Sequence, residues 1–476
     1  MSIACSRGKI QGMTRDIIRV RIAPSPTGIP HIGTTRTALY NYLFAQKNKG
    51  KFILRIEDTD QKRLIPGSLP KILQIFKLLG LKWDEGPFIQ SERLNIYKKY
   101  AKELVDSKKA YYCFCSQERL DKLRKEQRKA GQLPKYDRYC LKLSPEEIKK
   151  KLSNKEKFVI RMKIPSERII FWNDLIQGKM EFESDILDDQ VLLKSDGFPT
   201  YHLAVVIDDY LMKISHVLRG VEWLSSTPKH ILLYQAFNWP LPHFAHMPLI
   251  LGPDKAKLSK RHGAKSALDY QSEGYLPEAI INFMAFLGWS YKDNSDLLSL
   301  KQLVEVFDLS KVRKSNPIFD LQKLDWFNSQ WIQKLSDKEL LLRVKSYLKI
   351  KIKDETLLKI IPLLKTRIQK LNQVNDLIEF FLKLPDYDKK IFKGERAKEE
   401  LEEVYQELEK LKNWQANEIY KLMKEICNKG GYNKKDFYVN LYIALEGKQS
   451  GLPVFDSMEI LGKKEVLERI KISSSF

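Results

Sequence analysis

The chain is poor in cysteine and has no long apolar run, and each shortage excludes a class of protein. Five cysteines among 476 residues argue against the disulfide framework of a small secreted domain. The longest apolar stretch, around Ala279–Trp289, is interrupted by Asn282 and Gly288 and is too short to cross a bilayer. The N-terminus lacks the charged region and apolar core of a secretory signal. We therefore expect a cytoplasmic protein with no membrane partner.

Acidic residues are also in deficit. The chain has 60 Asp and Glu against 83 Lys and Arg, a formal net charge of +23. An excess of this size predicts attraction to a polyanion such as nucleic acid, although a Lys-rich composition bias would give the same number. No internal repeat or low-complexity segment is evident beyond Lys-rich helices. The length allows several domains, each with its own core.

The most informative stretch is Arg21–Thr34, which is R-I-A-P-S-P-T-G-I-P-H-I-G-T. A short β-branched run ending at Ile22 predicts a strand before it. The prolines and glycine of the stretch exclude regular structure, and the apolar period that follows predicts a helix ended by Gly50. Lys51–Glu57 is typical of a second strand. The order strand, loop, helix, strand predicts a βαβ unit with parallel strands.

Ligands in open α/β sheets bind beyond the carboxyl ends of the strands, beside helix N-termini. His31, Gly33 and Thr34 occupy that place in the predicted unit. Gly33 would let a nucleotide pack against the backbone, and the His31 imidazole can donate to a phosphate. These residues indicate a nucleotide site, although loop composition alone equally allows a proline-rich turn with a capping threonine.

Two motifs resemble those of a known enzyme family. The proline-rich stretch, together with R-I-E-D-T-D at Arg55–Asp60, closely resembles the nucleotide-binding motif of class I aminoacyl-tRNA synthetases, and specifically of bacterial-type glutamyl-tRNA synthetases. Lys257–Arg261, K-L-S-K-R, resembles the second class I motif, a lysine loop around the ATP phosphates. Asp196–Ala204 and His216–His230 are similar to segments of the same family, and the likeness covers nearly the whole chain.

The resemblance implies an α/β fold. We expect a Rossmann-like parallel-sheet catalytic domain split by an α+β insertion, followed by all-α C-terminal anticodon-binding domains. The expected boundaries are 1–12 for an N-terminal tail, 13–96 and 200–252 for the two catalytic halves, 97–199 for an acceptor-stem-binding insertion, 253–335 for a stem-contact domain carrying the lysine loop, and 336–476 for the helical anticodon-binding domain. Residues 1–12 precede a second methionine, Met13, and are interpreted as a tail or a misplaced start.

Hydrophobic periodicity predicts the all-helical C-terminal part without the resemblance. Helical periods run over Leu340–Leu348, Leu357–Leu371 and Ala397–Trp414, and no strand pattern is present after about residue 336. The family uses such a domain to read the anticodon, whose unstacked bases can be gripped by Arg and aromatic side chains. Arg367 is the candidate base reader, against the alternative of a solvated surface charge.

The resemblance also implies the site residues. His31 and Lys260 are the candidate catalytic residues. The implied ATP site comprises Pro24, Thr27, Gly28, His31, Gly33, Thr34, Lys257, Ser259, Lys260 and Arg261. The implied glutamate pocket comprises Arg21, Ala23, Ser25, Glu57, Tyr201 and Arg219. In that pocket Arg21 pairs with the side-chain carboxylate of glutamate, Arg219 contacts a carboxylate of the substrate, and Glu57 helps hold the α-amino group. A guanidinium binds a carboxylate bidentately and bonds a neutral amide less well, which suits a glutamate site.

Two positions depart from the commonest family pattern. Val205 stands where some relatives have asparagine, and Val221 stands where an acidic residue usually follows Arg-Gly. The second change removes a charge near the pocket, although Glu222 follows directly. Activity is expected, but the grip on glutamate and the rejection of glutamine depend on how the chain compensates.

Three cysteines of the insertion form a candidate zinc knot. Thiolates suit Zn²⁺, so Cys113, Cys115 and Cys140 are candidate ligands, and a closed site needs a fourth. Lys142 stands where some relatives have histidine and is a poor ligand while protonated. Tyr136 is the candidate fourth ligand, because related proteins use a tyrosine four residues before the last cysteine. A metal-free thiol cluster stays open, since other family members lack these cysteines.

A basic helix lies between the cysteines and suits contact with a phosphate backbone, with a solvated helix face as the alternative. Its basic residues are Lys122, Arg124, Lys125, Arg128 and Lys129. The implied nucleic-acid partner is tRNA(Glu), with tRNA(Gln) as a second substrate in a non-discriminating enzyme.

The implied reaction has two steps. The α-carboxylate of L-glutamate attacks the α-phosphorus of ATP, which carries Mg²⁺, and releases pyrophosphate; the 2′-hydroxyl of the terminal tRNA adenosine then takes the glutamyl group. Four alternatives stay open: a non-discriminating enzyme, a glutaminyl-tRNA synthetase, a truncated paralogue that glutamylates a modified base, and an inactive RNA-binding paralogue. The helical C-terminal part argues against the second and third of these, and both phosphate motifs argue against the last. The family habit is a monomer.

Overall fold

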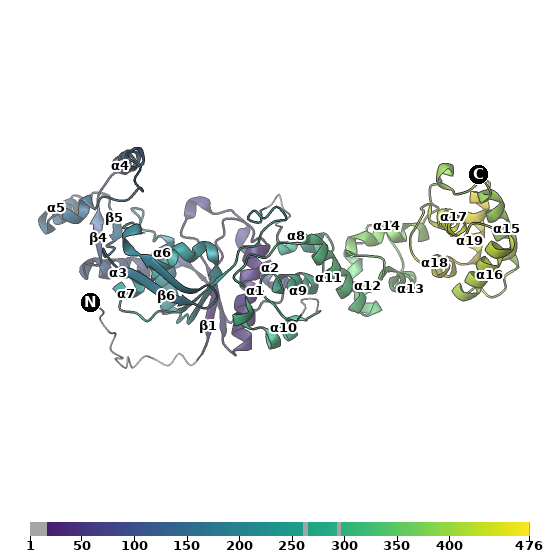
Figure 1. Cartoon of the computed structure of the whole chain (residues 1–476), viewed down its shortest axis with the longest axis horizontal. Coiled ribbons are helices and arrows are strands. Elements are labelled where there is room, and N and C mark those ends of the chain that lie inside the picture. Colours follow the sequence, from purple (N-terminus) through teal and green to yellow (C-terminus); the bar gives the residue numbers. More distant parts are fainter. Residues whose placement is uncertain (1–16, 260–264, 293–296, 476) are drawn as a thin grey trace. The chain divides into compact units, whose positions relative to one another are not determined.

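The structure is a computed structural model that describes residues 17–259, 265–292 and 297–475. It divides into two compact units. One contains the described residues up to Leu268 together with Ile281–Asp320, and the other contains Asp269–Ile280 together with the described residues from Leu321 onward. The first unit combines sheets and helices, and the second is built from helices (Figure 1). The predicted α/β fold with a helical C-terminal part is confirmed.

The first sheet of the first unit contains the predicted βαβ unit. Strand β1 (Arg19–Ile22) pairs in parallel with β2 (Lys51–Ile56), and β2 pairs in parallel with β3 (Glu85–Ile89). Helix α1 (Ile32–Lys47) connects β1 to β2, and α2 (Ser68–Leu78) connects β2 to β3. The last five residues of β2 are all buried, as expected for a parallel strand covered on both faces.

A second sheet has the strand order β7, β6, β10, β9. Strand β10 (His243–Met247) pairs in parallel with β9 (His216–Gly220) and with β6 (Ile169–Asp174), and β6 pairs antiparallel with β7 (Gly178–Glu183). Helices α6 (Tyr201–Leu211) and α7 (Thr227–Ala236) belong to this part of the chain. The first sheet continues into the second beside β1, where the Ser215 N–H donates to the Arg19 carbonyl at 2.9 Å.

The segment expected to be an insertion contributes to two sheets. Its own three-stranded antiparallel sheet has the order β4 (Ala110–Cys113), β5 (Val159–Met162), β8 (Val191–Leu193). Strands β6 and β7, from the same segment, instead extend the second catalytic sheet. Three helices, α3 (Leu94–Asp106), α4 (Gln117–Lys129) and α5 (Pro145–Ser153), complete this region.

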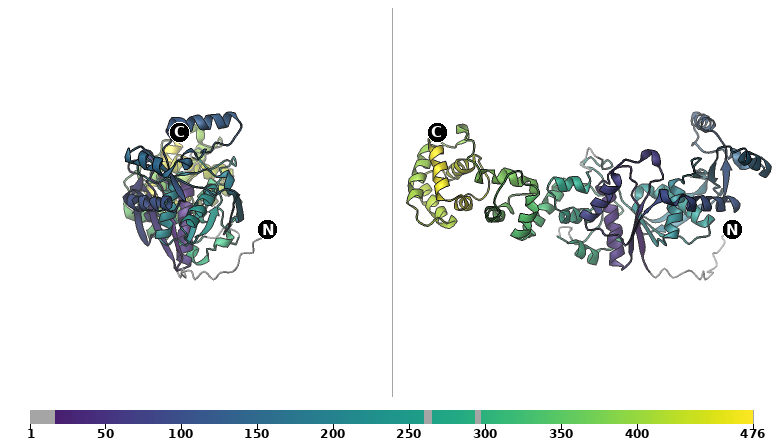
Figure 2. Two further views of the ribbon diagram at one scale, coloured as in Figure 1. Left: turned by 90° about the vertical axis from the view of Figure 1, so that its left-hand side faces the viewer. Right: turned by 180° about the vertical axis from the view of Figure 1, so that it is seen from behind.

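The remaining helices follow in chain order, and the packed helices of the C-terminal unit are seen from behind in the right-hand view of Figure 2. They are α8 (Ala267–Ser272), α9 (Pro277–Ala285), α10 (Leu300–Val306), α11 (Leu321–Lys334), α12 (Asp337–Lys345), α13 (Asp354–Leu364), α14 (Val374–Ile378), α15 (Ala397–Lys410), α16 (Ala416–Lys429), α17 (Lys434–Glu446), α18 (Val454–Leu461) and α19 (Lys463–Ser474). None of the helices within the described ranges is long and apolar enough to cross a membrane.

The three predicted C-terminal helices are present, and each ends earlier than its apolar period suggests; α12 ends at Lys345, before Leu348. Helix α13 ends at Leu364, and Leu371 is buried from a separate 3₁₀ turn. Helix α15 ends at Lys410, and the Trp414 indole beyond it donates to the Met458 carbonyl at 2.9 Å. Apolar spacing marks residues that contact the core, and a turn can supply such residues as well as a helix can.

A buried amide joins three segments of the C-terminal unit. The Asn440 side chain on α17 exchanges two hydrogen bonds with the backbone of Lys393 and donates to the Glu400 carboxylate on α15 at 2.8 Å. Asn440 is fully buried and Glu400 is almost so. Loss of the amide would leave buried backbone and carboxylate groups without partners.

We therefore expect Asn440→Ala to lower the free energy of unfolding of this unit by about 2 kcal/mol. Hydrogen exchange of peptides from α15 and α17 in the full chain, followed in increasing urea, measures the change. Asn413→Ala is the control, because this exposed amide contacts Gln415 at 3.4 Å and its removal should cost less than about 0.5 kcal/mol. Equal losses in the two variants would contradict the assignment.

Candidate active site

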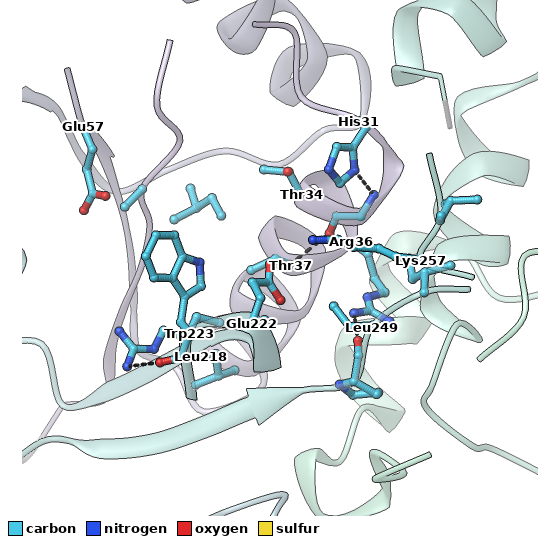
Figure 3. A pocket seen from close by; sticks show the side chains of 18 of the residues that line it. His31, Thr34, Arg36, Thr37, Glu57, Leu218, Glu222, Trp223, Leu249 and Lys257 are labelled. Carbon is cyan, nitrogen blue, oxygen red and sulfur yellow. Dashed lines mark hydrogen bonds between the residues drawn. The ribbon is translucent and has the colours of Figure 1, made fainter. Parts of the chain in front are cut away.

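An open pocket lies at the carboxyl ends of β1, β2 and β9 (Figure 3). Its lining residues are Arg21, Ile22, Ala23, His31, Gly33, Thr34, Arg36, Thr37, Glu57, Tyr201, Leu218, Arg219, Gly220, Glu222, Trp223, Pro248, Leu249, Ile250, Lys257 and Leu258. In Figure 3, His31, Arg36 and Lys257 gather on one side of the pocket and Glu57 lies on the other. The pocket therefore has a cationic side at the start of α1, and its two acidic residues are Glu57 on the opposite side and Glu222.

His31 is the N-cap residue of α1. Its Nδ1 accepts a hydrogen bond from the Gly33 N–H at 3.0 Å, which leaves Nε2 as the donor of the neutral ring. Burial in the pocket wall is the main cause that lowers the pKa of His31. The charges of Lys257 and Arg36 lower it further, and the charge of Glu222 opposes them. A Cβ on Gly33 would lie 2.8 Å from His31 Cε1, so glycine is required for this ring position.

The second predicted motif begins close to the first. Leu251 and Lys257 form an antiparallel bridge, and the Gly252 N–H donates to the Ala256 carbonyl at 2.8 Å, so Lys257 ends a tight hairpin. Beyond it, the Lys265 carbonyl accepts from the Ile32 N–H in the first turn of α1 at 3.1 Å. Lys260 and Arg261, the other cations predicted here, lie outside the described residues.

The opposite side of the pocket rests on a buried network of charges. Asp209 on α6 accepts from Arg21 Nε at 3.0 Å and from Arg55 NH1 at 2.7 Å, and Arg55 NH2 donates to Glu57 at 3.0 Å. Arg55 is fully buried, and Arg21 and Asp209 are nearly so. Burial raises the pKa of Glu57, against the attraction of Arg55 and Arg21. The network holds Arg21 and Glu57 in the pocket wall while Asp209 balances part of the positive charge.

Arg219 at the end of β9 is bound differently, and its side chain is buried. Its Nε donates to His246 Nε2 at 3.0 Å, and its NH1 donates to His230 Nδ1 at 3.2 Å. Its NH2 donates to Thr227 Oγ1 at 2.8 Å, and longer contacts join the guanidinium to the Tyr201 hydroxyl at 3.4 Å and the Trp223 carbonyl at 3.3 Å. Within the described residues Arg219 has no carboxylate at ion-pair distance.

The structure brings most of the predicted site residues together and leaves some outside the pocket lining. Those that line it are Arg21, Ala23, His31, Gly33, Thr34, Glu57, Tyr201, Arg219 and Lys257. Those that do not are Pro24, Ser25, Thr27, Gly28 and Ser259. Pro24 has a supporting position, because its carbonyl accepts from the Glu57 N–H at 3.1 Å and fixes the loop against the end of β2. Val205 is buried and Val221 is outside the lining, so neither valine lies in the pocket wall.

Several residues of the site were not predicted from the sequence. Arg36 lines the pocket, is buried, and donates to the carbonyls of Pro248 and Leu287, which ties α1 to two distant segments. A cation at helical spacing from the apolar Leu39, Tyr40 and Leu43 was the available signal. Trp223 also lines the pocket, and its ring lies 4.4 Å from that of Tyr201. His230 and His246 had no local signal, because their role depends on Arg219 from a neighbouring strand.

The cysteines of the insertion form one compact group. The Sγ atoms of Cys113, Cys115 and Cys140 all lie within 4.8 Å of one another, and the Tyr136 hydroxyl is 3.4 Å from Cys113 Sγ and 3.3 Å from Cys115 Sγ. Tyr136 and two of the thiols are buried. Three thiols and one phenol oxygen at this spacing fit the four ligands of a closed zinc site.

Arg367 and the basic helix lie on the surface. Arg367 is exposed just beyond the end of α13, and its N–H donates to the Leu364 carbonyl at 2.9 Å. Helix α4 has no buried residue, and Arg124 forms an ion pair with Asp121. These positions are open to a large partner, and they are equally typical of solvated charges.

Comparison with known proteins identifies the class. The model of "tRNA synthetases class I (E and Q), catalytic domain" matches residues 17–326, and the model of "Anticodon binding domain" matches residues 339–473. The first match covers more than half of the chain, which therefore belongs to the class I tRNA synthetase family of E and Q specificity.

The similar proteins narrow the class further. A glutamate–tRNA ligase of Finegoldia magna is 41% identical over 95% of this chain and 98% of its own length, and one of a Marinomonas species is 45% identical over 94% and 93%. The crystal structure of a glutamate tRNA ligase from Elizabethkingia meningosepticum in complex with its amino acid has a TM-score of 0.89 and 39% identity, over 96% of this chain and 99% of that one. The sequence-based resemblance to glutamyl-tRNA synthetases is confirmed.

The cluster of Cys113, Cys115 and Cys140 leads to a prediction that can be tested without an activity measurement. We expect the purified full chain to hold about one zinc ion after exhaustive dialysis, as counted by plasma mass spectrometry. Cys115→Ser should lower that content strongly, because it removes one of four ligands. Cys427→Ser is the control: Cys427 is buried in the C-terminal unit, and its thiol donates to the Tyr432 carbonyl. A zinc content that is the same in the wild type and in Cys115→Ser would contradict the assignment.

Proposed function

We propose that this chain is a glutamate–tRNA ligase, which activates L-glutamate with ATP and transfers it to the 3′-terminal adenosine of tRNA(Glu). The observation that carries the proposal is one pocket that is lined by two arginines, Arg21 and Arg219, by the acidic Glu57 and by the N-terminus of α1. That combination suits a substrate with two carboxylates and one ammonium group beside a polyphosphate. The near full-length similarity to glutamate–tRNA ligases supports the same activity.

At the cationic side, His31, Gly33, Thr34 and Lys257 are proposed to hold the ATP phosphates. The positive dipole end of α1 adds to the attraction of an anion. Lys260, which lies outside the described residues, is proposed to help neutralise the charge that develops as pyrophosphate leaves. Mg²⁺ would enter with ATP and shield the same charge.

At the other side, Arg21, Tyr201 and Arg219 are proposed to bind the side-chain carboxylate and Glu57 the α-amino group. The α-carboxylate would then lie between them and the phosphates, where one of its oxygens attacks the α-phosphorus. Positioning and charge stabilisation carry this step, and no side chain forms a covalent intermediate. The neutral amide of glutamine would leave buried guanidinium charge without a counter-ion, which disfavours it.

The RNA contacts are proposed from charge and position. Helix α4 would contact the acceptor arm through its exposed basic residues, and Arg367 would contact the anticodon. A few side chains that contact the anticodon would decide whether tRNA(Gln) is charged as well. The test below distinguishes the two cases. Zinc held by Cys113, Cys115, Tyr136 and Cys140 would join β4 to the segment after α4 and supply rigidity there. We also propose that the protein is a monomer in the cytoplasm.

Aminoacylation tests the proposal directly. We expect the purified protein to attach radiolabelled glutamate to tRNA(Glu) in the presence of ATP and Mg²⁺. A parallel reaction with tRNA(Gln) distinguishes a discriminating enzyme from a non-discriminating one. Binding of both tRNAs without charging of either would support the inactive RNA-binding alternative and reject the ligase.

The position of His31 gives a second prediction. We expect Gly33→Ala to lower kcat/KM for ATP by about tenfold or more, because its Cβ displaces the His31 ring. The KM for glutamate should change little, since Gly33 is on the phosphate side. Kinetics of the two single variants and of the double variant with His31→Ala check the cause. If Gly33→Ala lowers activity just as much in the His31→Ala background, the two residues act independently and the explanation fails.

A further inference from the structure

The two arginines of the pocket differ in what holds them. Arg21 shares the carboxylate of Asp209 with Arg55, so part of its charge is already balanced. Arg219 is only 5% exposed, and all of its short hydrogen bonds go to uncharged acceptors, two imidazole nitrogens and one hydroxyl. A buried guanidinium is costly without a counter-ion. Its surroundings must therefore hold it firmly while its charge stays available.

His246 Nε2 can accept the hydrogen bond from Arg219 Nε only if the ring proton is on Nδ1. His246 Nδ1 is hydrogen-bonded to Asp174 Oδ2 at the end of β6, and both side chains are fully buried. Burial raises the pKa of Asp174, but the His246 ring N–H and backbone N–H groups outweigh it, and the net pKa is lowered. An ionised carboxylate can only accept, so the proton is on Nδ1 and the lone pair of Nε2 faces Arg219.

The tautomer of His230, which accepts from Arg219 NH1, is fixed in a similar way. His230 Nδ1 faces Arg219, so this nitrogen must be the unprotonated one. The proton is then on His230 Nε2, which lies 3.0 Å from His202 Nδ1 and donates to it. His230 is buried, and burial together with the charge of Arg219 lowers its pKa well below the usual value, so the ring is neutral.

We propose that Asp174 with His246, and His202 with His230, are positioning residues that present Arg219 as an unneutralised cation to the side-chain carboxylate of the substrate. They orient the guanidinium through neutral nitrogens, where an acidic residue would cancel its charge. Arg219 would then carry most of the discrimination between a carboxylate and a neutral amide. This inference rests on the proposed function, because it takes glutamate as the substrate.

Asp174→Asn is the sharpest test, because it changes one atom of the chain of hydrogen bonds. Oδ1 would still accept from the backbone N–H groups of Ile176, Gln177 and His246, so the turn after β6 is kept. The new amide NH₂ would donate to His246 Nδ1 and move the ring proton to Nε2, where it opposes the Arg219 N–H.

We expect this variant to raise the KM for glutamate by about 10- to 100-fold and to lower the preference for glutamate over glutamine. The KM for ATP should be unchanged. Aminoacylation of tRNA(Glu) with glutamate or glutamine varied gives these constants, and calorimetry of L-glutamate binding gives the affinity without the reaction.

Asp189→Asn is the matched control. Asp189 is as buried as Asp174, and its Oδ1 likewise accepts a backbone N–H, from Ile164, but it lies in the insertion away from Arg219. The KM of the Asp189→Asn variant for glutamate should stay within about twofold of the wild-type value. A second pair of variants covers the other side of Arg219: His230→Ala should raise the KM for glutamate, and His230→Asn should restore it in large part, because the amide oxygen can replace Nδ1 as the acceptor.

The outcomes separate this inference from the proposed function. A wild type that neither binds nor charges glutamate overturns both. A wild type that charges glutamate, with an unchanged KM in Asp174→Asn and a raised KM in Arg219→Ala, overturns the inference alone. A parallel loss in Asp189→Asn, or a KM for ATP that rises together with that for glutamate, would reduce the role of Asp174 to stability and also overturn it. If Asp174→Asn does not fold, failure of His230→Asn to restore what His230→Ala loses would overturn it.

Discussion

Asp209 is the residue on which the pocket depends. It accepts hydrogen bonds from Arg21 and Arg55, so one carboxylate joins α6 to the ends of β1 and β2. Burial of these charges is favourable only when all of them are paired, since removal of any one leaves a buried charge without a partner. The strands and the helix must therefore meet in one arrangement before the network is satisfied. The same arrangement places Arg21 and Glu57 in the pocket wall.

The fold separates two demands that compete in any site for a small anion. A binding cation must be held in one place, and its charge must not be cancelled before the ligand arrives. Arg21 meets the first demand through Asp209, at the expense of part of its charge. Arg219 meets both, because two imidazoles of fixed tautomer orient it and contribute no charge. The pocket thereby combines a balanced arginine with an unbalanced one.

The sequence predicts the parts of the site that are local in the chain. The loop after β1, the start of α1 and the end of β2 lie within Arg21–Glu57, and their spacing already places His31 and Gly33 at a helix N-terminus. Tyr201 and Arg219 come from the family resemblance. The partners that hold these residues lie far apart in the chain: Arg219 and His246 are on neighbouring strands, and Asp174 is on β6. Spacing carries no information on such contacts, so the network of Asp209 and the orientation of Arg219 needed the structure.

The position of Asp174 also gives the insertion a second role. The sequence predicts a unit for RNA contact between the two catalytic halves, with a candidate zinc knot at Cys113. Its strand β6 pairs with β10 in the catalytic sheet, and its last residue, Asp174, reaches Arg219 through His246. A shift of β6 would therefore act on the tautomer of His246 and on the grip of Arg219. A continuous set of hydrogen bonds thus connects the segment expected to hold the acceptor arm to the pocket expected to hold the amino acid, and it gives RNA binding a physical means to influence amino-acid binding.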